Sequence, residues 1–524
     1  MKHKVCILAA GVGNRMGELS EHVNIAVLPV NNKAVISYII EKFPMQTEFV
    51  IAVGHKKETV IDYLKLAHPE RRFTFVHVDK YTGPGTGPGY SILKCEKHLR
   101  EPFIFFTADT MVLEDIPPPD QNWMGIAPVK ETELYCTVRM RNNLIVQLDN
   151  KIKTDNKFAF IGLGGVKDYE DFFSVLTHDQ EIQKGEVQVV TGFARLIEKK
   201  LVPIGFTWFD TGSFKNYADT NRNFSGGGTK FDFSKGDEFL YFVNGRVIKF
   251  FADAKTAKNR YERATKHLKG LAPKMEAHRG NFYSYKLVEG QTLYSMLNAR
   301  LVREFLAWAS KHLWKPLKLD AKKKKEFAAA SRRFYRDKTL ERVEAYQKKV
   351  GEGERAIING LEVPPIAELL GKVDWDTMSE SIPVPFHGDL QFDNVLYVGA
   401  KKGRHPFVLL DWRQDFGGLI HAGDLYYDLA KLYGGVTMSY PLIKEGMFTY
   451  TGTDTSADYK FFIKSDLLEA KDELEDFILA NKYDLKKIRT LTALIFLNMA
   501  PLHHDPFDRL LYHHGRSMLH KALK

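Results

Sequence analysis

The first 222 residues alternate short runs rich in β-branched and aromatic residues with amphipathic stretches. KVCILAA is followed by AVISYIIEKF, EFVIAVG, KKETVIDYLKLA and FTFVHV, and later by PFIFFTAD. Strand-length apolar runs that alternate with helix-length amphipathic segments predict βαβ units, in which helices cover the faces of a mainly parallel sheet. The pattern therefore predicts an α/β domain with a mixed, mainly parallel sheet over residues 1–224.

A glycine cluster, SGGGTK at 225–230, interrupts this alternation and predicts a linker. After it come the strand-like runs EFLYFV, GRVIKFF and NFYSYKLVEG, and then a long remainder with helical periodicity. We therefore expect a second domain of α+β class over 225–524, with a small lobe at about 225–292 and a helical lobe at about 293–524. A chain of 524 residues is expected to form two or three domains.

Composition restricts the class of protein. With 44% hydrophobic and 27% charged residues, the chain is neither disordered nor collagen-like. It contains no apolar stretch of about 18 residues and no signal-peptide cleavage pattern, so we expect a cytoplasmic protein without a membrane span. Cys6, Cys95 and Cys136 are too few for a disulfide framework and have no CxxC spacing for zinc, which fits a reducing compartment.

The net charge of +10 is compatible with nucleic acid, anionic membranes or phosphorylated small molecules. The basic run Lys322–Lys325 lies in a helical stretch and is interpreted as a solvated helix face. Neither half shows a nucleic-acid motif. We therefore expect small-molecule substrates and nucleotides as partners.

A glycine-rich turn, LAAGVGNRM, follows the first strand. Gly11 and Gly13 allow the backbone to turn tightly and bring N–H groups against an anion, and Arg15 would hold a phosphate. The third glycine of GxGxxG is missing because Met16 stands there, while Gly17 comes one residue late. This departure disfavours a dinucleotide-binding interpretation.

Six motifs follow one another in order over about the first 220 residues: LAAGVGNRM, NIAVLPVNNKAVI, GPGTGPGYS, FFTADT, GEVQVVTGF and TWFDTGSFKNYAD. Together they resemble the sugar-phosphate nucleotidyltransferase family. The resemblance implies a Rossmann-like domain that uses an NTP such as CTP, UTP or GTP. It also implies that Gly11, Gly13 and Arg15 hold the triphosphate, and that Gly85 and Thr86 approach the base.

The same resemblance implies a magnesium site. Asp109 and Asp210 match the family's two metal-binding aspartates. Mg²⁺ is usually held by one or two carboxylates plus substrate phosphates, and it offsets charge as the sugar phosphate attacks the α-phosphorus. A strand-end cap is the alternative role for Asp109. Glu186 matches a position that contacts sugar hydroxyls, and Lys151 matches the family's phosphate-binding lysine.

One departure concerns a lysine. The family usually has PK or NK where this chain has Asn24 and Ile25. An isoleucine cannot donate a hydrogen bond to an oxyanion, and losing one such donor typically lowers the rate by about 10²- to 10³-fold. Arg15, Lys33 or a second metal must then substitute, or this half is slow or merely binds nucleotide. We hypothesise that it remains active, with Arg15 as its catalytic cation, because the acidic pair is retained.

The second half contains HGDLQFDN, followed by LLDW. Phosphoryl transfer from ATP requires a carboxylate that orients the hydroxyl and accepts its proton, and oxygen ligands that hold Mg²⁺. Asp389 would be the catalytic carboxylate, and Asn394 and Asp411 the metal ligands. The spacing between Asp389 and Asn394 is that of protein kinases. Gly388 and the DW pair resemble the aminoglycoside phosphotransferase and choline kinase family. The resemblance implies a bilobal, protein-kinase-like fold in which His387 supports the catalytic loop.

Further residues match this kinase-like pattern. Lys249 lies in the strand-like GRVIKFF, where such folds keep a phosphate-binding lysine, and Glu262 is its natural ion-pair partner. A surface lysine and a surface glutamate are the alternative. Gly236 belongs either to the turn over the ATP phosphates or to a plain hairpin. In GDLYYDLAKL we expect Asp424 to brace the catalytic loop, with Asp428 as the second choice.

Two segments are candidates for the acceptor site. His503 and Asp505 in HHDPFDR either line an acceptor pocket or form a helix terminus. Adjacent histidines point in different directions on a helix, so a metal site is not expected there. Arg413 and Asp415 follow a predicted metal ligand and are suitable for binding substrate hydroxyls.

These features predict a bifunctional enzyme. The kinase half would phosphorylate a small hydroxyl metabolite, most simply a sugar, and the other half would join that phosphate to a nucleoside monophosphate. The product would be an NDP-activated precursor for a surface glycan such as a capsule. The alternatives are a choline or ethanolamine kinase with a cytidylyltransferase, a kinase fused to a lapsed nucleotide-binding domain, and an antibiotic-modifying phosphotransferase.

Overall fold

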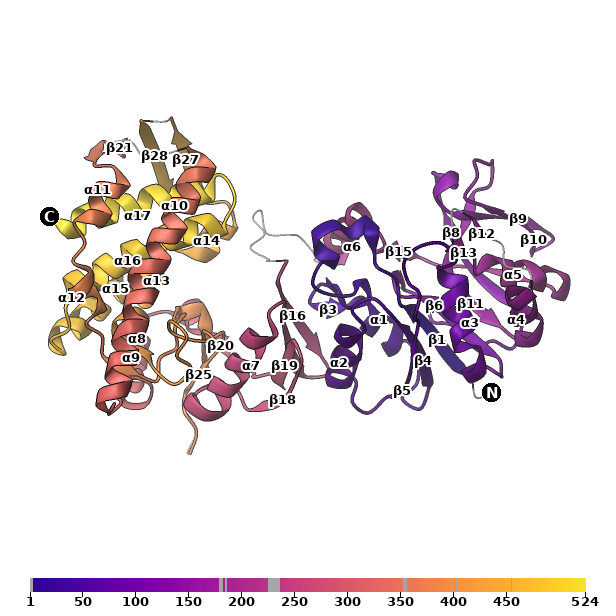
Figure 1. The fold of residues 1–524 in the computed structure, drawn as a ribbon, viewed down its shortest axis with the longest axis horizontal. Helices are drawn as coiled ribbons and strands as arrows, with labels where there is room; N and C mark the ends of the chain where they lie inside the picture. Colours follow the sequence, from indigo (N-terminus) through magenta and orange to yellow (C-terminus); the bar gives the residue numbers. More distant parts are fainter. Residues whose placement is uncertain are drawn as a thin grey trace. The chain divides into compact units, whose positions relative to one another are not determined.

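The computed structural model describes residues 3–178, 182–183, 186–224, 236–351, 356–400, 403–453 and 455–524. The chain divides into two compact units (Figure 1). The described residues of the first unit lie within 3–254 and 277–287, and those of the second within 255–276 and 288–524. The expected SGGGTK linker lies outside the described residues.

The first unit is built on a mixed sheet. Its strands are β1 (Lys4–Ala9), β4 (Glu48–Val53), β5 (Arg72–His77), β6 (Phe103–Thr107), β8 (Trp123–Pro128), β9 (Cys136–Arg141), β10 (Leu144–Asn150), β11 (Phe158–Val166) and β14 (Val202–Gly205). The main path runs β10-β9-β11-β6-β1-β4-β5, with β8 joined to β11 and to β14. β6, β1, β4 and β5 are mutually parallel, whereas β11 is antiparallel to β6. The mixed α/β sheet expected from the sequence is thus confirmed.

Helices cover both faces of this sheet (Figure 1). They are α1 (Val35–Glu41), α2 (Lys57–Ala67), α3 (Pro88–Cys95), α4 (Tyr169–His178), α5 (Val190–Leu196) and α6 (Phe214–Phe224). Because side chains alternate along a strand, Val5 and Ile7 of β1 pack in one core with α1 and α2. Cys6 points to the other core, with α3, α4 and α5.

Short ribbons complete the first unit. They are β2 (Pro29–Val30) with β3 (Lys33–Ala34), β7 (Thr110–Val112) with β15 (Trp208–Asp210), and β12 (Ile182–Gln183) with β13 (Glu186–Val187). The β7–β15 ribbon is antiparallel and pairs Asp210 with Thr110. It therefore fixes two segments that are far apart in the sequence next to each other.

A small sheet contains the strands expected at the start of the second domain: β16 (Glu238–Val243), β17 (Arg246–Phe251), β18 (Met275–Arg279) and β19 (Phe282–Lys286), in the order β16-β17-β19-β18. Its strands β16, β17 and β19 group with the first unit. Tyr241 of β16 lies 4.8 Å, between ring centroids, from Tyr63 of α2, and its hydroxyl donates to the carbonyl of Val27 at 2.8 Å. The apolar side chains of this small sheet therefore belong to the same hydrophobic core as one face of the α/β sheet.

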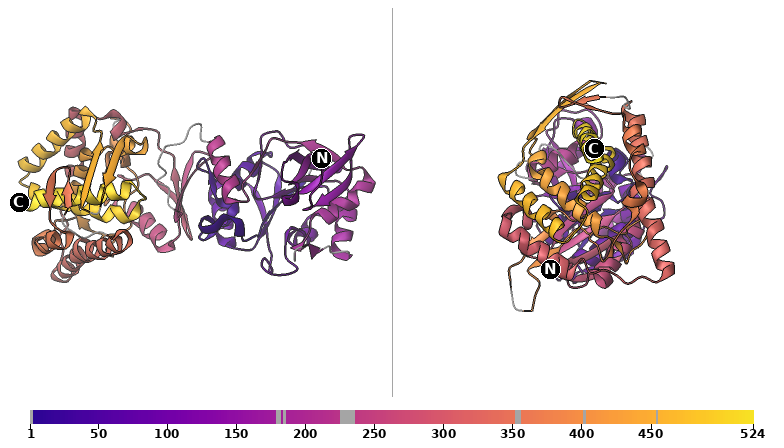
Figure 2. Two further views of the ribbon diagram at one scale, coloured as in Figure 1. Left: turned by 90° about the horizontal axis from the view of Figure 1, so that it is seen from above. Right: turned by 90° about the vertical axis from the view of Figure 1, so that its left-hand side faces the viewer.

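The second unit is mainly helical. Its helices are α7 (Ala254–Glu262), whose first residue belongs to the first unit, α8 (Ala299–His312), α9 (Ala321–Arg332), α10 (Lys338–Val350), α11 (Ile366–Gly371), α12 (Trp375–Ser379), α13 (Leu425–Thr437), α14 (Tyr440–Lys444), α15 (Ser465–Ala480), α16 (Leu485–Met499) and α17 (Phe507–Leu523). Asp320, Asp424 and Asp484 cap α9, α13 and α16 by accepting hydrogen bonds from N–H groups of the first turn. The yellow helices α16 and α17 lie side by side (Figures 1 and 2).

Short strands accompany these helices. They are β20 (Gln291–Thr292), β24 (Val395–Tyr397) and β25 (Phe407–Leu409) in one sheet, β21 (Ala356–Ile358), β22 (Leu361–Val363), β27 (Phe448–Gly452) and β28 (Ser456–Phe461) in another, and the pair β23 (Pro383–Val384) and β26 (Gly423–Asp424). Within the residues described, no helix is both long and apolar enough to cross a membrane. The kinase-like architecture of this unit stays a prediction.

Candidate active sites

The first unit contains a cavity of about 650 Å³ at the carboxyl ends of β1 and β6. Ligands of open α/β sheets bind at this edge. Among the residues predicted from the sequence, those that line it are Gly11, Gly13, Arg15, Thr86, Asp109, Lys151, Glu186 and Asp210. Gly85 is not among its lining residues. The cavity thus brings together motifs that are nearly 200 residues apart in the sequence.

Two carboxylates and a guanidinium converge in this cavity. The N–H of Thr211 donates to the carbonyl of Asp109 at 2.9 Å and extends the β7–β15 pairing. A Cβ atom placed on Gly212 would lie 2.5 Å from Asp109 Oδ2, 2.9 Å from Arg15 Nη2 and 3.1 Å from Asp210 Oδ1. Three charged groups therefore surround one point, which stays open because Gly212 has no side chain.

The electrostatics of this point favour a cation. Burial and the nearby carboxylate of Asp210 raise the pKa of Asp109, while a hydrogen bond from Thr107 and the charge of Arg15 act against the rise. Within the described residues, no group of three or more His, Cys, Asp or Glu side chains is placed to hold a metal. Two carboxylates completed by substrate phosphates are a usual ligand set for Mg²⁺, so these residues fit that ion.

Neighbouring groups orient Asp210. Asn216 Nδ2 donates to its Oδ2 at 2.6 Å, and the N–H of Gly212 donates to its Oδ1 at 2.7 Å. The hydroxyl of Tyr135 donates to Oδ2 at 3.4 Å. Sequence reasoning missed these three residues. The proximity of Gly212 and Asn216 to Asp210 in TWFDTGSFKN was the available signal for two of them.

The glycine turn is supported by Asn24, which is buried. Its Nδ2 donates to the carbonyls of Ala9 at 3.1 Å and His55 at 2.8 Å. Ile25 lines the cavity, and its Cγ2 lies 2.3 Å from where a Cβ on Gly13 would stand. The position after Asn24 therefore gives the cavity an apolar wall.

Lys33 does not replace the family lysine at this wall. Its ammonium forms an ion pair with Glu41 at 2.7 Å, and it is not among the lining residues of the cavity. Arg15 is the cation that the structure brings to the acidic pair.

The lining of the cavity also contains Glu186 and Lys151, predicted for the sugar phosphate, and Thr86, predicted for the base. Thr86 and Glu186 form a parallel bridge, and the N–H of Val187 donates to the carbonyl of Thr86 at 2.6 Å. Glu186 Oε2 lies 3.7 Å from Lys151 Nζ. A carboxylate and an ammonium are thus held together within the cavity.

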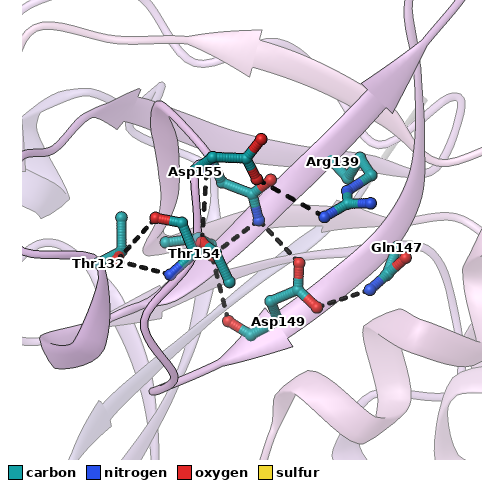
Figure 3. A network of polar contacts seen from close by, with 8 residues as sticks. Thr132, Arg139, Gln147, Asp149, Thr154 and Asp155 are labelled. Carbon is teal, nitrogen blue, oxygen red and sulfur yellow. Dashed lines mark hydrogen bonds and ion pairs between the residues drawn. The ribbon is translucent and has the colours of Figure 1, made fainter.

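A polar network holds the segment that carries Lys151 (Figure 3). Asp149 accepts from Gln147 Nε2 at 2.6 Å and from Asn156 Nδ2 at 2.8 Å. The N–H of Lys151 itself donates to the carbonyl of Tyr135 at 2.9 Å. The loop between β10 and β11 is therefore anchored at both ends.

In the second unit, Asp428 binds the backbone of the predicted catalytic loop. It is fully buried, and its oxygens accept from the N–H groups of His387 at 2.8 Å and Gly388 at 2.7 Å. Trp314 Nε1 also donates to it at 3.1 Å. Burial raises the pKa of Asp428 to about 6.

Asp424, the first choice for this bracing contact, has other partners. It accepts from the Tyr335 hydroxyl at 2.6 Å and from the N–H of Ile382 at 2.9 Å. The direct contact with the loop therefore comes from Asp428, one helical turn further along α13.

His387 connects the loop to the segment that carries Asp411. Its Nδ1 accepts from the N–H of Asp389 at 3.1 Å, and its Nε2 bonds to the carbonyl of Leu410 at 2.7 Å. Burial lowers the pKa of His387 to about 4, so the ring is neutral near pH 7.

The three residues expected to support phosphoryl transfer lie at one end of the β24–β25 hairpin. Asn394 directly precedes β24, and Asp411 follows β25, which pairs with β24 from Leu409 to Val395. The N–H of Leu410 donates to the carbonyl of Asn394 at 2.8 Å, and Asn394 Nδ2 donates to the carbonyl of Asp389 at 2.8 Å.

Both carboxylates of this group form ion pairs. Asp389 Oδ1 lies 2.6 Å from Lys431 Nζ, and Asp411 Oδ1 lies 3.4 Å from Arg260 Nη1. Burial alone would raise the pKa of Asp389, but the ammonium of Lys431 outweighs it and holds that pKa below its usual range. Sequence reasoning missed Lys431 and Arg260.

The residues predicted for the ATP side are divided between the two units. Lys249 is buried in β17 of the first unit, and exposed Gly236 lies shortly before β16. Glu262 belongs to the second unit and forms an ion pair with Lys266 at 2.5 Å. Their joint role stays a prediction.

The two acceptor segments differ in their contacts. His503 stacks edge-on against Phe507 at 5.0 Å between ring centroids, and exposed Asp505 pairs with Arg509 at 3.0 Å, so both contacts are local to the start of α17. By contrast, the N–H of Arg413 donates to the carbonyl of His387 at 2.9 Å. Asp415 accepts from the N–H of Gly418 at 3.0 Å.

Comparisons with known proteins concern the first unit. Residues 5–115 match the family model of the MobA-like NTP transferase domain. The bifunctional protein GlmU of Methanococcus vannielii is 24% identical over 230 residues, which cover 42% of this chain and 54% of that protein. The first part of the chain carries a nucleotidyltransferase-type domain. This confirms the corresponding part of the sequence prediction.

A second curated relative matches a similar share of this chain. GlmU of Methanococcus maripaludis is 24% identical over 226 residues, covering 42% of this chain and 53% of that protein. The chain thus spans about half the length of the curated relatives it matches. A solved structure of UDP-glucose pyrophosphorylase complexed with UDP-glucose aligns with a TM-score of 0.38 and 20% identity, over 43% of this chain and 99% of that one.

Proposed function

We propose that the chain is a bifunctional enzyme that makes a nucleotide-activated metabolite. Its nucleotidyltransferase domain transfers a nucleoside monophosphate from an NTP to a phosphorylated metabolite, most simply a sugar phosphate, and releases pyrophosphate. Its second unit phosphorylates the hydroxyl of that metabolite with ATP. The observation that carries the proposal is the convergence of Asp109, Asp210 and Arg15 on the open point beside Gly212.

In the transferase reaction, an oxygen of the metabolite phosphate forms a bond to the α-phosphorus. The bond from that phosphorus to the bridging oxygen breaks, and its electron pair leaves with pyrophosphate. Mg²⁺ bound by Asp109 and Asp210 would offset the charge of the triphosphate. Arg15 donates to phosphate oxygens at the same point, while Lys151 and Glu186 of the same cavity orient the metabolite.

In the kinase reaction, Asp389 orients the acceptor hydroxyl and accepts its proton as the oxygen bonds to the γ-phosphorus of ATP. ADP leaves with the electron pair of the broken bond. Lys431 keeps Asp389 ionised and ready to accept a hydrogen bond. Asn394 and Asp411 would hold the Mg²⁺ that neutralises the ATP phosphates.

The two reactions fit as consecutive steps. The kinase reaction creates a phosphate monoester, and the transferase reaction uses such a monoester as its nucleophile. An NDP-activated sugar made in this way would serve glycan synthesis.

A second candidate follows from Ile25. It lines the cavity at the position where the sugar-phosphate nucleotidyltransferase family, which the sequence resembles, usually has a lysine. The transferase domain could therefore have lost its chemistry and kept nucleotide binding. Under this alternative, no NTP releases pyrophosphate with any sugar phosphate, and the Ile25→Lys variant gains that activity.

The test measures pyrophosphate release and ADP formation separately. Asp109→Asn should abolish pyrophosphate release and leave ADP formation intact, and Asp389→Asn should do the converse. The exposed residues Asp120 and Asp472 supply matched controls as Asp→Asn variants. Loss of both activities in either variant would contradict two independent sites.

A further inference from the structure

Positive side chains from three segments lie near one another, and two of them, Arg413 and Lys431, lie near Asp389. Lys338 and Arg342 lie one turn apart on α10, Arg413 follows Asp411, and Lys431 belongs to α13. At i and i+4 the two α10 cations share a helix face, an arrangement that destabilises a helix when the charges are alike. Their proximity therefore needs a reason other than the stability of α10.

One aromatic ring joins two of these cations. Lys338 Nζ lies 3.5 Å from the ring centroid of Phe334, and Arg413 Cζ lies 5.0 Å from the same centroid. The backbone of Arg413 is bonded to His387, and a Cβ on Gly388 would lie 2.6 Å from Arg413 Cβ. This cation cluster, Lys338, Arg342, Arg413 and Lys431, is thus attached to the loop of Asp389.

The cluster has donors in excess of its acceptors. Arg413 Nε is buried and has no hydrogen-bond partner. Within the described residues, the ammonium of Lys338 makes no hydrogen bond or ion pair and contacts only aromatic rings. Arg342 Nη1 donates to the carbonyl of Asn498 at 3.0 Å, a neutral partner.

The charge of the cluster is only partly compensated. Burial lowers the pKa of Lys338 well below its ordinary value, and the charges of Arg413, Arg342 and Lys431 lower it further. Asp415 opposes this effect, while Asp389 is already paired with Lys431. Lys338, Arg342 and Arg413 are partly buried, and cations removed from water in excess of their counter-ions are costly. Arginine donors match the oxygens of carboxylates and phosphates.

We propose that the cation cluster binds an anionic group of the acceptor, so that the metabolite phosphorylated beside Asp389 already carries a carboxylate or a phosphate. This inference rests on the proposed kinase function of the second unit. It excludes choline and aminoglycosides as good acceptors, because their positive charge would be repelled by the cluster.

The first test compares matched acceptors by ADP formation. Glycerol is compared with glycerate and glycerol 3-phosphate, glucose with glucuronate and glucose 6-phosphate, and choline is included as the cation. We expect kcat/KM to be at least tenfold higher for an anionic compound than for its neutral parent, and the two anions distinguish carboxylate from phosphate. Preference for a neutral or cationic acceptor would overturn the inference.

The second test removes two charges from the cluster. Lys338→Met with Arg342→Met should raise the KM of the anionic acceptor at least tenfold and leave the KM of ATP unchanged. Lys322→Met with Lys325→Met removes the same charge from the exposed face of α9 and should change neither. A rise in the KM of ATP instead would show that the cluster binds nucleotide, contrary to the inference.

Calorimetry with inorganic phosphate separates this inference from the kinase proposal. Phosphate binding that is weakened in the α10 double variant but not in the α9 control supports an anion site, even if no compound yields ADP. In that case only the kinase proposal fails. Unchanged phosphate binding in the α10 variant, with an unchanged unfolding midpoint, overturns the anion site whatever the kinase result.

Discussion

The two candidate sites differ in what lies next to their carboxylates. In the nucleotidyltransferase domain, Asp109 and Asp210 face each other across the point left open by Gly212. In the second unit, Asp389 is paired with Lys431. The first site therefore contains a repulsion that a bound cation would relieve, whereas the carboxylate of the second site is already paired with a cation of the protein.

The largest expected effect is on the second site. Asp428→Ala removes the acceptor of two buried N–H groups and of Trp314 Nε1, and each unsatisfied group costs about 1–3 kcal/mol. We expect the free energy of unfolding of this unit to fall by about 3 kcal/mol or more, with loss of ADP formation. Urea denaturation measures the change.

The control for Asp428→Ala is Asp484→Ala, which removes the N-cap of α16 and should cost only about 1 kcal/mol. An equal effect of the two substitutions would show that Asp428 is an ordinary helix residue.

The next effect concerns the open point of the first site. In Gly212→Ala, a methyl group would stand among Asp109, Arg15 and Asp210, and would displace whatever binds there. Pyrophosphate release should fall by about 10²-fold or more, since the variant disrupts preorganised charges at the reacting phosphates. ADP formation should be unchanged.

Gly205→Ala is the matched control, because nothing lies within 4 Å of a Cβ at that position. Full pyrophosphate release by Gly212→Ala would mean that the chemistry occurs elsewhere in the cavity.

A smaller effect is expected where the small sheet meets the α/β core. His68 Nδ1 accepts from Asn244 Nδ2 at 3.3 Å, and its Nε2 bonds to the Ser37 hydroxyl at 2.8 Å. Burial, with help from neighbouring cations, lowers the pKa of His68 from 6.5 to about 4. The folded state thus favours the neutral ring, so this stabilisation is complete above pH 6.5 and is lost as the pH falls towards 4.

The loss should be about 2.5 kcal/mol between these pH values, measured as the free energy of unfolding in urea. His68→Gln should remove that part of the pH dependence, while His22→Gln should keep it. A His68→Gln profile that parallels the unsubstituted protein would contradict the assignment.

The sequence predicts most of what lies at strand ends. Asp109 follows β6, at the carboxyl edge of the sheet where ligands of α/β domains bind, so its motif could be tied to that edge. Lys431 could not be assigned, because its distance to Asp389 depends on how α13 packs. The run EFLYFV predicts a strand, but it does not predict which part of the chain the strand packs against. In the structure, Tyr241 of this strand packs on Tyr63.

The most direct test of the comparison is hydrogen exchange in EDTA of two variants, Asp109→Asn and Asp389→Asn. Removing one of two repelling carboxylates should slow exchange in β7 and β15. Removing Asp389 leaves Lys431 buried and unpaired, so exchange in 387–394 and α13 should accelerate by the equivalent of about 1–3 kcal/mol. Opposite signs at the two sites are the predicted result; the same sign at both would contradict the account.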